Sequence, residues 1–354
     1  MPPEPSQSIC AQMKDQGLPE YLRPIAMTDA ARPAGALPLA GGPCWFDRVE
    51  VLGRTGAPQI VPASDLPLAD QQRLSAPRPD FGTLSLQTPR IMGILNITPD
   101  SFSDGGLFLQ PEAAVMQARL MASGAEIIDI GGESTRPGAV EVSVDEETTR
   151  TAPVIAALRA GGLDAAISID TRKAGVARAA LKAGASWVND VTALQFDPTM
   201  AALVAEKNVP VILMHSIATP DTMQDDPRYD DVLLDVYDAL AMRVAEAEAA
   251  GVARRNIAID PGIGFGKTLA HNLALLQRLS LFHNLGLPVL LGASRKRFIG
   301  TIGVETEAAR RMPGSLAVAL WGVAQGVQMI RVHDVTETRQ ALALWQAAQN
   351  GASA

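Results

Sequence analysis

The sequence of 354 residues predicts an α/β fold, a (β/α)8 TIM barrel preceded by a proline-rich N-terminal extension. Three observations indicate the barrel. From residue 90 onward, short apolar runs alternate with Ala- and Leu-rich stretches of helical spacing, the apolar runs number eight, and most are apolar throughout. Strands that are apolar on both sides are buried on both faces, as in parallel sheets. Eight strand–helix repeats in about 260 residues have the size of such a barrel.

The eight expected strands are short and rich in aliphatic residues. They lie at 91–96, 126–132, 166–170, 186–190, 210–216, 257–262, 288–294 and 329–334, and expected helices include 111–124, 173–184 and 231–251. Several of these helices end at glycine, as at Gly124, Gly184 and Gly251, where a left-handed cap is expected. A doubly wound open sheet also alternates strand and helix. The count of eight, with no strand left over, favours the barrel.

The N-terminal extension is predicted to span residues 1–88, and the barrel residues 89–350. Fourteen of the 25 prolines precede residue 90, which excludes a regular stack of helices or central strands there. The plausible strands of the extension are 45–54 and 58–64, and residues 1–30 are expected to be mobile. We expect the extension to be partly ordered, to pack over one end of the barrel and to lie outside the functional site.

The composition limits the class of partner. A formal charge of −8 argues against general affinity for nucleic acid or an anionic membrane, so an anionic ligand requires locally gathered cations. No apolar run reaches membrane-spanning length, and the first residues lack the pattern of a signal peptide. The two cysteines, Cys10 and Cys44, make a disulfide framework or a thiolate metal cage improbable. This cysteine usage suits the cytoplasm.

Polar and charged groups follow nearly every expected strand. In a (β/α)8 barrel the carboxyl ends of the strands meet at one rim, where chemistry occurs. The groups at these ends are Asn96, Asp129, Asp170, Asn189, Asp190, Met214, His215, Ser216, Asp260, Ser294, Arg295, Lys296, Arg297, Arg331 and His333. Turn chemistry explains aspartate, serine and glycine, but it does not explain why arginine, lysine and histidine gather at the same rim.

The strand-end groups divide by charge. The candidate anion holders are Arg136, Lys296, Arg331 and His333, with hydroxyls on Ser134, Thr135 and Ser294. Arginine binds phosphate oxygens through a planar fork and lysine binds them as a point charge. Asn96 can supply a neutral oxygen to Mg²⁺, which shares its ligands with substrate phosphates. A heterocycle with N–H donors suits the carboxylates and amide of Asp129, Asp170, Asp260 and Asn189.

Simpler interpretations stay open for single residues. One aspartate at a strand end is also typical of an Asx turn or a helix N-cap. His215 fits a site residue or a hydrogen-bonded core residue equally, whereas His271 and His283 are expected on the surface. The segment 262–267, GIGFGK, matches neither of two glycine-rich nucleotide-binding motifs. A Walker loop would need glycine at position 261, which is proline, and a dinucleotide-binding fingerprint would need glycine at position 267, which is lysine. Its glycines are expected to let backbone approach a ligand closely.

Several motifs, in order, resemble those of dihydropteroate synthases. They are GILNITPDSFSDGG, GAEIIDIGGESTRPGA, SIDTRK, WVNDVTAL, DPGIGFGK, GASRKRFIG and IRVHDV, and the resemblance covers about residues 88–348. It implies condensation of 6-hydroxymethyl-7,8-dihydropterin diphosphate with 4-aminobenzoate, with Mg²⁺ as cofactor, in folate biosynthesis. The fifth strand–helix loop departs from the family pattern, since Ala218 stands where glycine is common.

The resemblance also implies roles for individual residues. The pterin would contact Asp129, Asp170, Asn189, Met214, Asp260 and Lys296, and the diphosphate would contact Thr135, Arg136, Arg331 and His333. Asn96 would bind Mg²⁺. The aminobenzoate would contact Phe102, Thr135, Pro137, Phe265 and Ser294. Of these, Asp170, Asp260, Lys296, Arg331 and His333 are the candidate catalytic residues. The family is usually dimeric, and the apolar helices within 316–348 would permit a homodimer here.

Two other functions share these features. A pterin-binding relative without catalysis would keep the pocket and lose the loop chemistry, which the intact Asn96, Thr135 and Arg136 argue against. An aldolase would form a Schiff base on Lys296, but the neighbouring cations fit an anion site better. No zinc spacing or nucleophile elbow occurs in the sequence.

Overall fold

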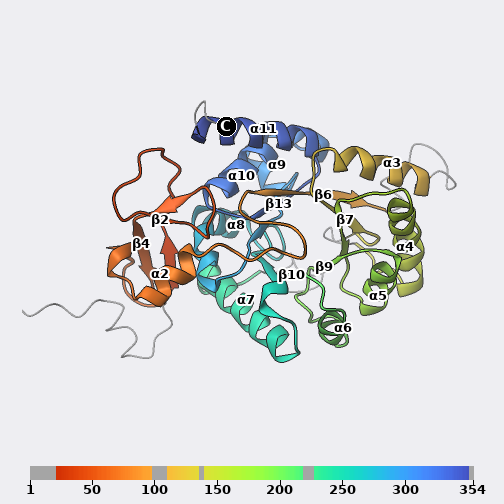
Figure 1. Cartoon of the computed structure of the whole chain (residues 1–354), viewed down its shortest axis with the longest axis horizontal. Helices are drawn as coiled ribbons and strands as arrows, with labels where there is room; N and C mark the ends of the chain where they lie inside the picture. The colour runs from red at the N-terminus through yellow and green to blue at the C-terminus, as the bar shows by residue number, and fades with distance from the viewer. Residues whose placement is uncertain (1–20, 98–109, 135–138, 218–226, 351–354) are drawn as a thin grey trace, which may run out of the picture.

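The computed structural model describes residues 21–97, 110–134, 139–217 and 227–350. A parallel eight-stranded sheet lies at its centre, with helices around it (Figure 1). The strands follow the order β11-β10-β9-β8-β7-β6-β13-β12. A parallel bridge between Ile259 and Val289 joins the two outer strands and closes the sheet. The (β/α)8 barrel predicted from the sequence is therefore confirmed.

All eight barrel strands lie within the expected segments or within one residue of them. They are β6 (Arg90–Asn96), β7 (Ile127–Gly131), β8 (Ala166–Asp170), β9 (Trp187–Asp190), β10 (Val211–Met214), β11 (Ile257–Asp260), β12 (Leu290–Leu291) and β13 (Met329–Val332). The seventh strand, β12, is much shorter than the expected 288–294. Because β12 has only two residues, the contact that closes the barrel between β11 and β12 is the single bridge between Ile259 and Val289.

Helices connect the strands and cover the outside of the barrel (Figure 1). They are α3 (Gln110–Ala122), α4 (Val144–Ala160), α5 (Ala174–Ala183), α6 (Met200–Lys207), α7 (Val232–Ala249), α8 (Leu269–Gln277), α9 (Arg297–Ile302), α10 (Met312–Ala324) and α11 (Val335–Asn350), with 3-10 turns η3 (Arg254–Asn256), η4 (Leu279–Leu285) and η5 (Ala308–Arg310). Helix α5 ends at Gly184 with a φ of 115°, the left-handed cap expected there. Within the described ranges, every helix falls short of the length and hydropathy that a bilayer crossing requires.

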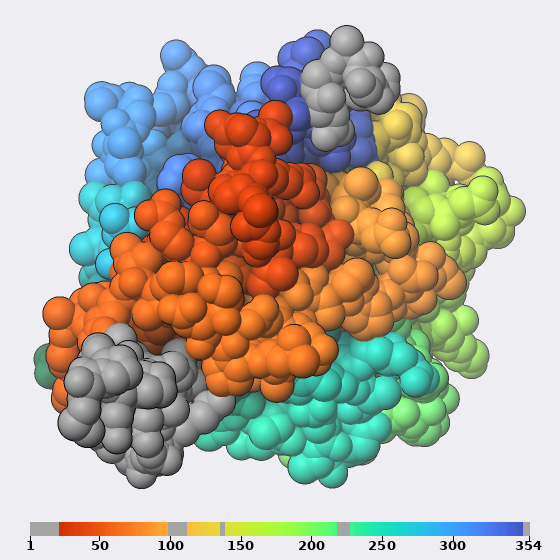
Figure 2. All heavy atoms as spheres, turned by 60° about the vertical axis from the view of Figure 1, so that its left-hand side comes forward, coloured from red at the N-terminus to blue at the C-terminus, as the bar shows by residue number. Residues whose placement is uncertain are grey.

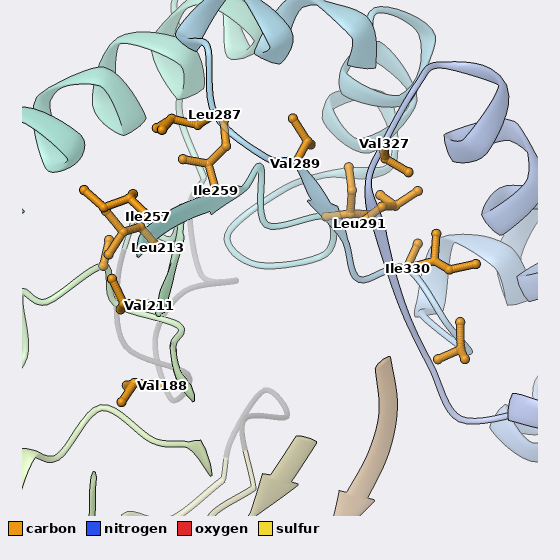
Figure 3. Close-up of a cluster of buried hydrophobic side chains, with 14 of the residues drawn as sticks. Val188, Val211, Leu213, Ile257, Ile259, Leu287, Val289, Leu291, Val327 and Ile330 are labelled. Atoms are coloured by element: carbon orange, nitrogen blue, oxygen red, sulfur yellow. The ribbon is translucent and has the colours of Figure 1, made fainter. Parts of the chain in front are cut away.

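The period of two along each strand sorts the side chains into an outer and an inner set. The outer set packs between sheet and helices, and Figure 3 shows part of it, including Val188, Val211, Leu213, Ile257 and Ile259. These residues are fully buried. Burial of such aliphatic side chains, each contributing about 1.5–3 kcal/mol relative to exposure, is the main force that holds the helices on the barrel.

The inner set begins with an apolar layer near the strand starts. Its members are Met92, Ile127, Trp187, Ile212, Ala258, Leu290 and Met329, with Phe81 and Leu86 from the segment before β6. Phe81 is fully buried and meets Trp187 edge to face, with ring centroids 4.8 Å apart. The amino-terminal end of the barrel is thus filled by side chains.

The described part of the N-terminal segment contains its own small sheets. Its elements are β1 (Tyr21–Pro24), β2 (Leu37–Pro38), β3 (Trp45–Phe46), β4 (Arg48–Leu52), β5 (Gln59–Pro62), η1 (Ala63–Asp65) and α2 (Leu68–Ser75). Strands β1, β4 and β5 form an antiparallel sheet. The strand expected at 58–64 is present as β5, whereas the single strand expected at 45–54 is divided into β3 and β4, which belong to different sheets. The expectation that residues 1–30 are mobile is wrong for β1, where Tyr21 is 1% exposed.

This segment packs on the outer helices on one side of the barrel. In Figure 2 its red and orange atoms lie between teal α7 below and the blue C-terminal helices above. The Ser280 hydroxyl donates to the Pro24 carbonyl over 2.7 Å, and the rings of Tyr21 and Tyr237 meet edge to face. Arg54 pairs with Asp238 on α7. The division of the chain at residue 88 stays a prediction.

Candidate active site

The inner positions beyond the apolar layer, near the carboxyl ends of the strands, are mostly occupied by polar residues. The register places Asp170 beside Gly131 and Asn189, and Met214 beside Asp260. Each lies an even number of residues beyond an inner apolar residue of its own strand, as Asp260 follows Ala258, so its side chain faces the barrel interior. The strands therefore bring Asp129, Asp170, Asn189, Met214, Asp260 and Arg331 to one chamber.

Arg331 links the two aspartates of β7 and β8. Its Nε donates to Asp129 Oδ2 over 2.6 Å, and its Nη2 donates to Asp170 Oδ2 over 2.7 Å. The amide of Asn189 donates to the same Asp129 oxygen over 3.0 Å. One guanidinium thus holds two buried carboxylates side by side, which is the arrangement that makes a buried pair tolerable.

One oxygen of each of these two carboxylates has no hydrogen-bond donor in the described part of the chain. Within the described residues, Oδ1 of Asp129 and Oδ1 of Asp170 are buried and accept no hydrogen bond. Burial raises the pKa of Asp170 to about 7; Arg331 opposes the rise and Asp129 adds to it. A buried acceptor without a donor is costly, so these oxygens are suited to N–H donors of a ligand.

Asp260, Lys296 and Arg331 also lie close enough in the chamber to interact electrostatically. A Cβ placed on Gly292 would lie 3.4 Å from Asp260 Oδ2 and 3.9 Å from the Arg331 side chain, so both side chains lie next to Gly292. Burial raises the pKa of Asp260 to about 6, while the Gly262 N–H, Lys296 and Arg331 oppose the rise. Burial also lowers the pKa of the Lys296 amine to about 7, against the attraction of Asp260.

Lys296 lies over an aromatic ring. Its Nζ is 3.9 Å from the centre of the Phe265 ring and donates to the Ile263 carbonyl. Gly264, in the same turn, makes room for the Lys296 stem, because a Cβ there would lie 2.6 Å from Cδ. The glycines of 262–267 therefore let backbone approach a site side chain of the protein.

Ser294 and His333 form a pair at the rim. The Ser294 hydroxyl lies 3.0 Å from Nδ1 of His333 and accepts from the His333 backbone N–H over 3.2 Å. These contacts join the ends of β12 and β13. The neighbouring Arg295, by contrast, pairs with Asp334 and has a φ of 58°, so it shapes the turn.

Asn96 ends β6 beside the Asp170 carboxylate. A Cβ on Gly131 would lie 3.5 Å from Asn96 Oδ1 and 3.6 Å from Asp170 Cβ, so both side chains lie next to Gly131. Among the described residues, no three His, Cys, Asp or Glu side chains gather as a metal-binding group. A lone neutral oxygen of this kind fits Mg²⁺ that takes its other ligands from phosphate and water.

Sequence reasoning missed Lys267 as a site residue. Its Nζ is 3.0 Å from Nδ1 of His215 and donates to the Phe265 carbonyl over 2.9 Å. Burial lowers the pKa of Lys267 to about 7 and that of His215 to about 3, where Lys267 contributes further. His215 is thus a buried neutral partner of a buried lysine. The sequence feature that could have identified Lys267 as a site residue is its position in the loop that follows the expected strand 257–262.

Other expectations resolve differently. Phe102, Thr135, Arg136, Pro137 and Ala218 lie outside the described residues. The Asp190 carboxylate accepts from the backbone of Thr192 and Leu194, which is the turn role. The prediction of a surface position for His283 is wrong: it is fully buried, with Nε2 3.0 Å from the Gln325 carbonyl. The N-terminal segment covers η4 and so buries it.

Comparison with known proteins identifies the family. The model of the family described as pterin binding enzyme matches residues 92–333, which contain the whole chamber. The chain is 47% identical to the dihydropteroate synthase of Escherichia coli (strain K12) over 266 residues, 75% of this chain and 93% of that protein. It is 45% identical to that of Haemophilus influenzae over 75% of this chain and 96% of the relative. The chain belongs to the dihydropteroate synthase family. As a member it is a transferase of folate biosynthesis.

Solved structures of this family share the fold. The Xanthomonas albilineans dihydropteroate synthase with 4-aminobenzoic acid is 48% identical, with a TM-score of 0.71, over 75% of this chain and 95% of that chain. The same enzyme in complex with 7,8-dihydropteroate is 45% identical, with a TM-score of 0.70, over 77% and 99%. The Yersinia pestis enzyme with a sulfonamide drug complex is 45% identical, with a TM-score of 0.72, over 76% and 97%. About a quarter of this chain has no counterpart in them.

Proposed function

We propose that the chain condenses 6-hydroxymethyl-7,8-dihydropterin diphosphate with 4-aminobenzoate to give 7,8-dihydropteroate and diphosphate. Membership of the family supports the reaction. The single observation that carries the site is the chamber in which Asp129 and Asp170 each keep a buried oxygen without a donor. A ring edge with paired N–H groups would satisfy both oxygens.

The pterin ring is proposed to lie against the inner carboxylates. Asp170 and Asp260 would accept from its N–H groups, Asn189 would exchange hydrogen bonds with it, and Lys296 would donate to an acceptor on the ring. Met214, 4% exposed and paired in register with Asp260, would pack on the ring face. Asp129 keeps Arg331 and Asn189 oriented while its free oxygen faces the ligand.

The diphosphate is proposed to bind at the rim. Arg331 lies near the end of the last strand and His333 directly follows it. Thr135 and Arg136 follow the second strand in the sequence, so all four are placed by sequence near the same opening. Asn96 would hold Mg²⁺, which when bound neutralises charge on the diphosphate. Ser294 fixes His333 through the contact with its ring.

The aminobenzoate is proposed to enter beside Phe265, whose ring lies under the Lys296 amine. Ser294 would border the same pocket, as would Phe102, Thr135 and Pro137 from the loops after the first two strands. An aromatic acid suits this combination of a ring face and cations, because the ring stacks and the carboxylate needs a positive partner.

The reaction is proposed to be SN1-like. The C–O bond to diphosphate breaks first, leaving a methylene cation conjugated with the pterin, and Asp170 and Asp260 stabilise that positive charge in a site of low dielectric. The neutral aryl amine then forms the C–N bond and loses a proton. An aniline nitrogen is already unprotonated near neutral pH, so no strong general base is required. Exclusion of water would protect the cation.

We also propose a homodimer in the cytoplasm. Helix α10 has no charged residue between Met312 and Ala324, yet Trp321 is 46% exposed. Beside it on α8, Leu269 and Leu273 are 40% and 43% exposed, and Trp321 Nε1 donates to the Leu276 carbonyl. A helix that is apolar all round belongs in an interior, so a second copy is the proposed cover. The free, buried thiol of Cys44 fits a reducing compartment.

A coupled assay tests the reaction. Dihydropteroate and diphosphate should appear together, only with both substrates and with Mg²⁺. Well-folded protein without turnover contradicts the proposal, and tight pterin binding without product would indicate a binding protein instead. Light scattering tests the dimer: the wild type should have twice the mass of a Trp321→Arg variant, and a monomeric wild type contradicts it.

A further inference from the structure

A buried lysine that the proposed function does not use holds the turn after β11 (residues 261–267, the β11 turn). Lys267 is 3% exposed. Its Nζ donates to the Phe265 carbonyl over 2.9 Å and to the His215 carbonyl over 3.4 Å, and lies 3.0 Å from Nδ1 of His215. An ammonium group has three N–H donors and no acceptor, so Nδ1 of the imidazole is the acceptor and all three donors are used.

None of these three acceptors is charged. Two are backbone carbonyls, and the third is an imidazole whose pKa burial lowers to about 3. Burial also lowers the pKa of Lys267 to about 7, while the attraction of Asp260 opposes the fall. A buried cation that donates to neutral groups keeps much of its desolvation cost. Packing alone therefore does not explain why a lysine occupies this position.

Lys267 joins the β11 turn to the end of the neighbouring strand, β10. His215 directly follows β10, and its N–H donates to the Asp260 carbonyl over 2.9 Å. A Cβ on Gly262, whose φ is 68°, would lie 2.0 Å from the His215 carbonyl oxygen, so the two loops are in contact. The same Cβ would lie 3.4 Å from the Lys267 Nζ. The ammonium group therefore closes the β11 turn onto β10 at the point where they meet.

The β11 turn carries groups that we propose to meet the substrates. The Lys296 Nζ lies 3.9 Å from the centre of the Phe265 ring, and the Ile263 carbonyl accepts from the same amine. Lys267 acts on this part of the turn directly, through the Phe265 carbonyl. Asp260, by contrast, belongs to β11 and is held by the ladder with β10. Loss of the Lys267 contacts should therefore displace the Phe265 ring more than the Asp260 carboxylate.

We propose that Lys267 is a positioning residue for the aromatic acid: by closing the β11 turn, it sets where the Phe265 ring and the Lys296 amine lie. The inference rests on the proposed function, which assigns 4-aminobenzoate to this ring. Loss of Lys267 should raise KM for 4-aminobenzoate most, because a displaced ring binds the substrate less well. A smaller rise in KM for the pterin diphosphate is expected too, since Lys267 and Asp260 attract each other.

Steady-state kinetics of the full chain test the positioning role. In Lys267→Met most of the stem is kept and all three donors are lost. KM for 4-aminobenzoate should rise about tenfold, the scale of a small displacement of a binding group. KM for the pterin diphosphate and kcat per folded molecule should change less than about threefold, because the groups that hold the pterin stay in their strands.

Arg78→Met is the matched control. Arg78, in the N-terminal segment, is 6% exposed, and its guanidinium donates to the backbone carbonyls of Arg73 and His283 over 3.0 Å each. This variant also loses a buried cation with neutral acceptors, but these acceptors lie in α2 and η4. It should lose stability and keep both KM values. A rise in KM in Lys267→Met is then not the general result of removing a buried cation.

A second variant and a second measurement cover the case in which Lys267→Met folds poorly. The double variant Lys267→Met with His215→Leu makes both side chains apolar and leaves no imidazole nitrogen unpaired. It should fold, and its KM for 4-aminobenzoate should be close to that of Lys267→Met, because the two residues act as a unit. Hydrogen exchange of the amides in the β11 turn, read by mass spectrometry, should be about tenfold faster in both variants and unchanged in Arg78→Met.

The outcomes separate this inference from the function on which it rests. An unchanged KM for 4-aminobenzoate in the folded variants overturns the positioning role, and so does unchanged exchange in the β11 turn. A rise in KM for the pterin diphosphate at least as large as that for 4-aminobenzoate also overturns it, because Lys267 then acts through its charge on Asp260. A wild type without turnover overturns the proposed function instead, and the exchange measurement still decides whether Lys267 orders the turn.

Discussion

The two layers of the barrel interior differ in how well their groups are satisfied. The layer near the strand starts contains Phe81, Trp187 and other apolar side chains in mutual contact. The layer near the strand ends, on the same strands, contains buried carboxylates with unpartnered oxygens and two lysines whose pKa is lowered by burial. One layer stabilises the fold, and the other holds groups whose partners we propose to be substrate atoms.

The largest expected effect is a loss of turnover, caused by a change in the layer near the strand ends (the upper layer); the layer near the strand starts is called the lower layer. Arg331→Ala should lower kcat by about a hundredfold or more, because it removes a donor from the departing diphosphate. It also leaves Asp129 and Asp170 without their cation, so some loss of stability is expected too. Arg331→Lys keeps a charge near both carboxylates and loses the fork. Steady-state kinetics per folded molecule, with thermal unfolding as control, measure both effects; unchanged kcat in either folded variant removes the proposed role.

The largest expected effect on stability comes from the lower layer. Phe81→Ala leaves a cavity beneath Trp187 and should lower the free energy of unfolding by about 3–5 kcal/mol. Denaturant unfolding measures this loss. Because Phe81 packs in the apolar layer, kcat per folded molecule should stay the same. A variant of normal stability, or one with a selective loss of kcat, would show that the two layers are not separable.

A pH series sharpens the comparison further. The pKa of Asp170 is raised from 3.8 to about 7, so its carboxylate costs stability as the pH rises from 4 through 7. Asp170→Asn removes that cost, and its melting temperature relative to the wild type should rise over this range. Asp197 is the control: burial raises its pKa, but the hydrogen bonds from Thr199 and Ala174 together outweigh that effect and lower it. The lowered pKa of Asp197 lies below this range, so the melting temperature of Asp197→Asn relative to the wild type should stay level from pH 4 to 7. An equally level curve for Asp170→Asn contradicts the assignment.

The smallest expected effect is at the rim. Ser294→Ala removes the acceptor for the His333 backbone N–H and the contact with its ring. The loss of one such hydrogen bond, about 1 kcal/mol, should appear mainly as a higher KM for the pterin diphosphate. Ser280→Ala, which removes a buried hydrogen bond to Pro24 far from the rim, should lower stability and leave KM unchanged. Equal KM in both variants speaks against a role for Ser294.

Much of the chamber could be predicted because strand periodicity is a local property. Once eight parallel strands are recognised, Asp170 and Asp260 fall at inner positions near the strand ends by counting. The cations at the rim could also be predicted from the sequence. Their hydrogen-bond partners could not, because the pairing of Arg331 with Asp129 spans 202 residues and depends on closure of the barrel.

The misses have a common cause. The burial of Lys267 and His283 and the order of β1 all come from packing between distant segments. Local patterns around a lysine after GFG or a histidine in a short turn are the same whether another segment covers them or not. The contacts of the buried Lys173 could not be predicted for the same reason, since its three acceptors lie 26 to 40 positions away along the chain.

The most direct test of the upper layer as a pterin site is calorimetric titration with 6-hydroxymethylpterin. The wild type should bind it, and Asp260→Ala, with its fold verified by circular dichroism, should lose binding, because the ring then lacks one of its two proposed carboxylate acceptors. Phe81→Ala should retain binding under conditions where it is folded. Undiminished affinity in Asp260→Ala would contradict the placement of the pterin in this chamber.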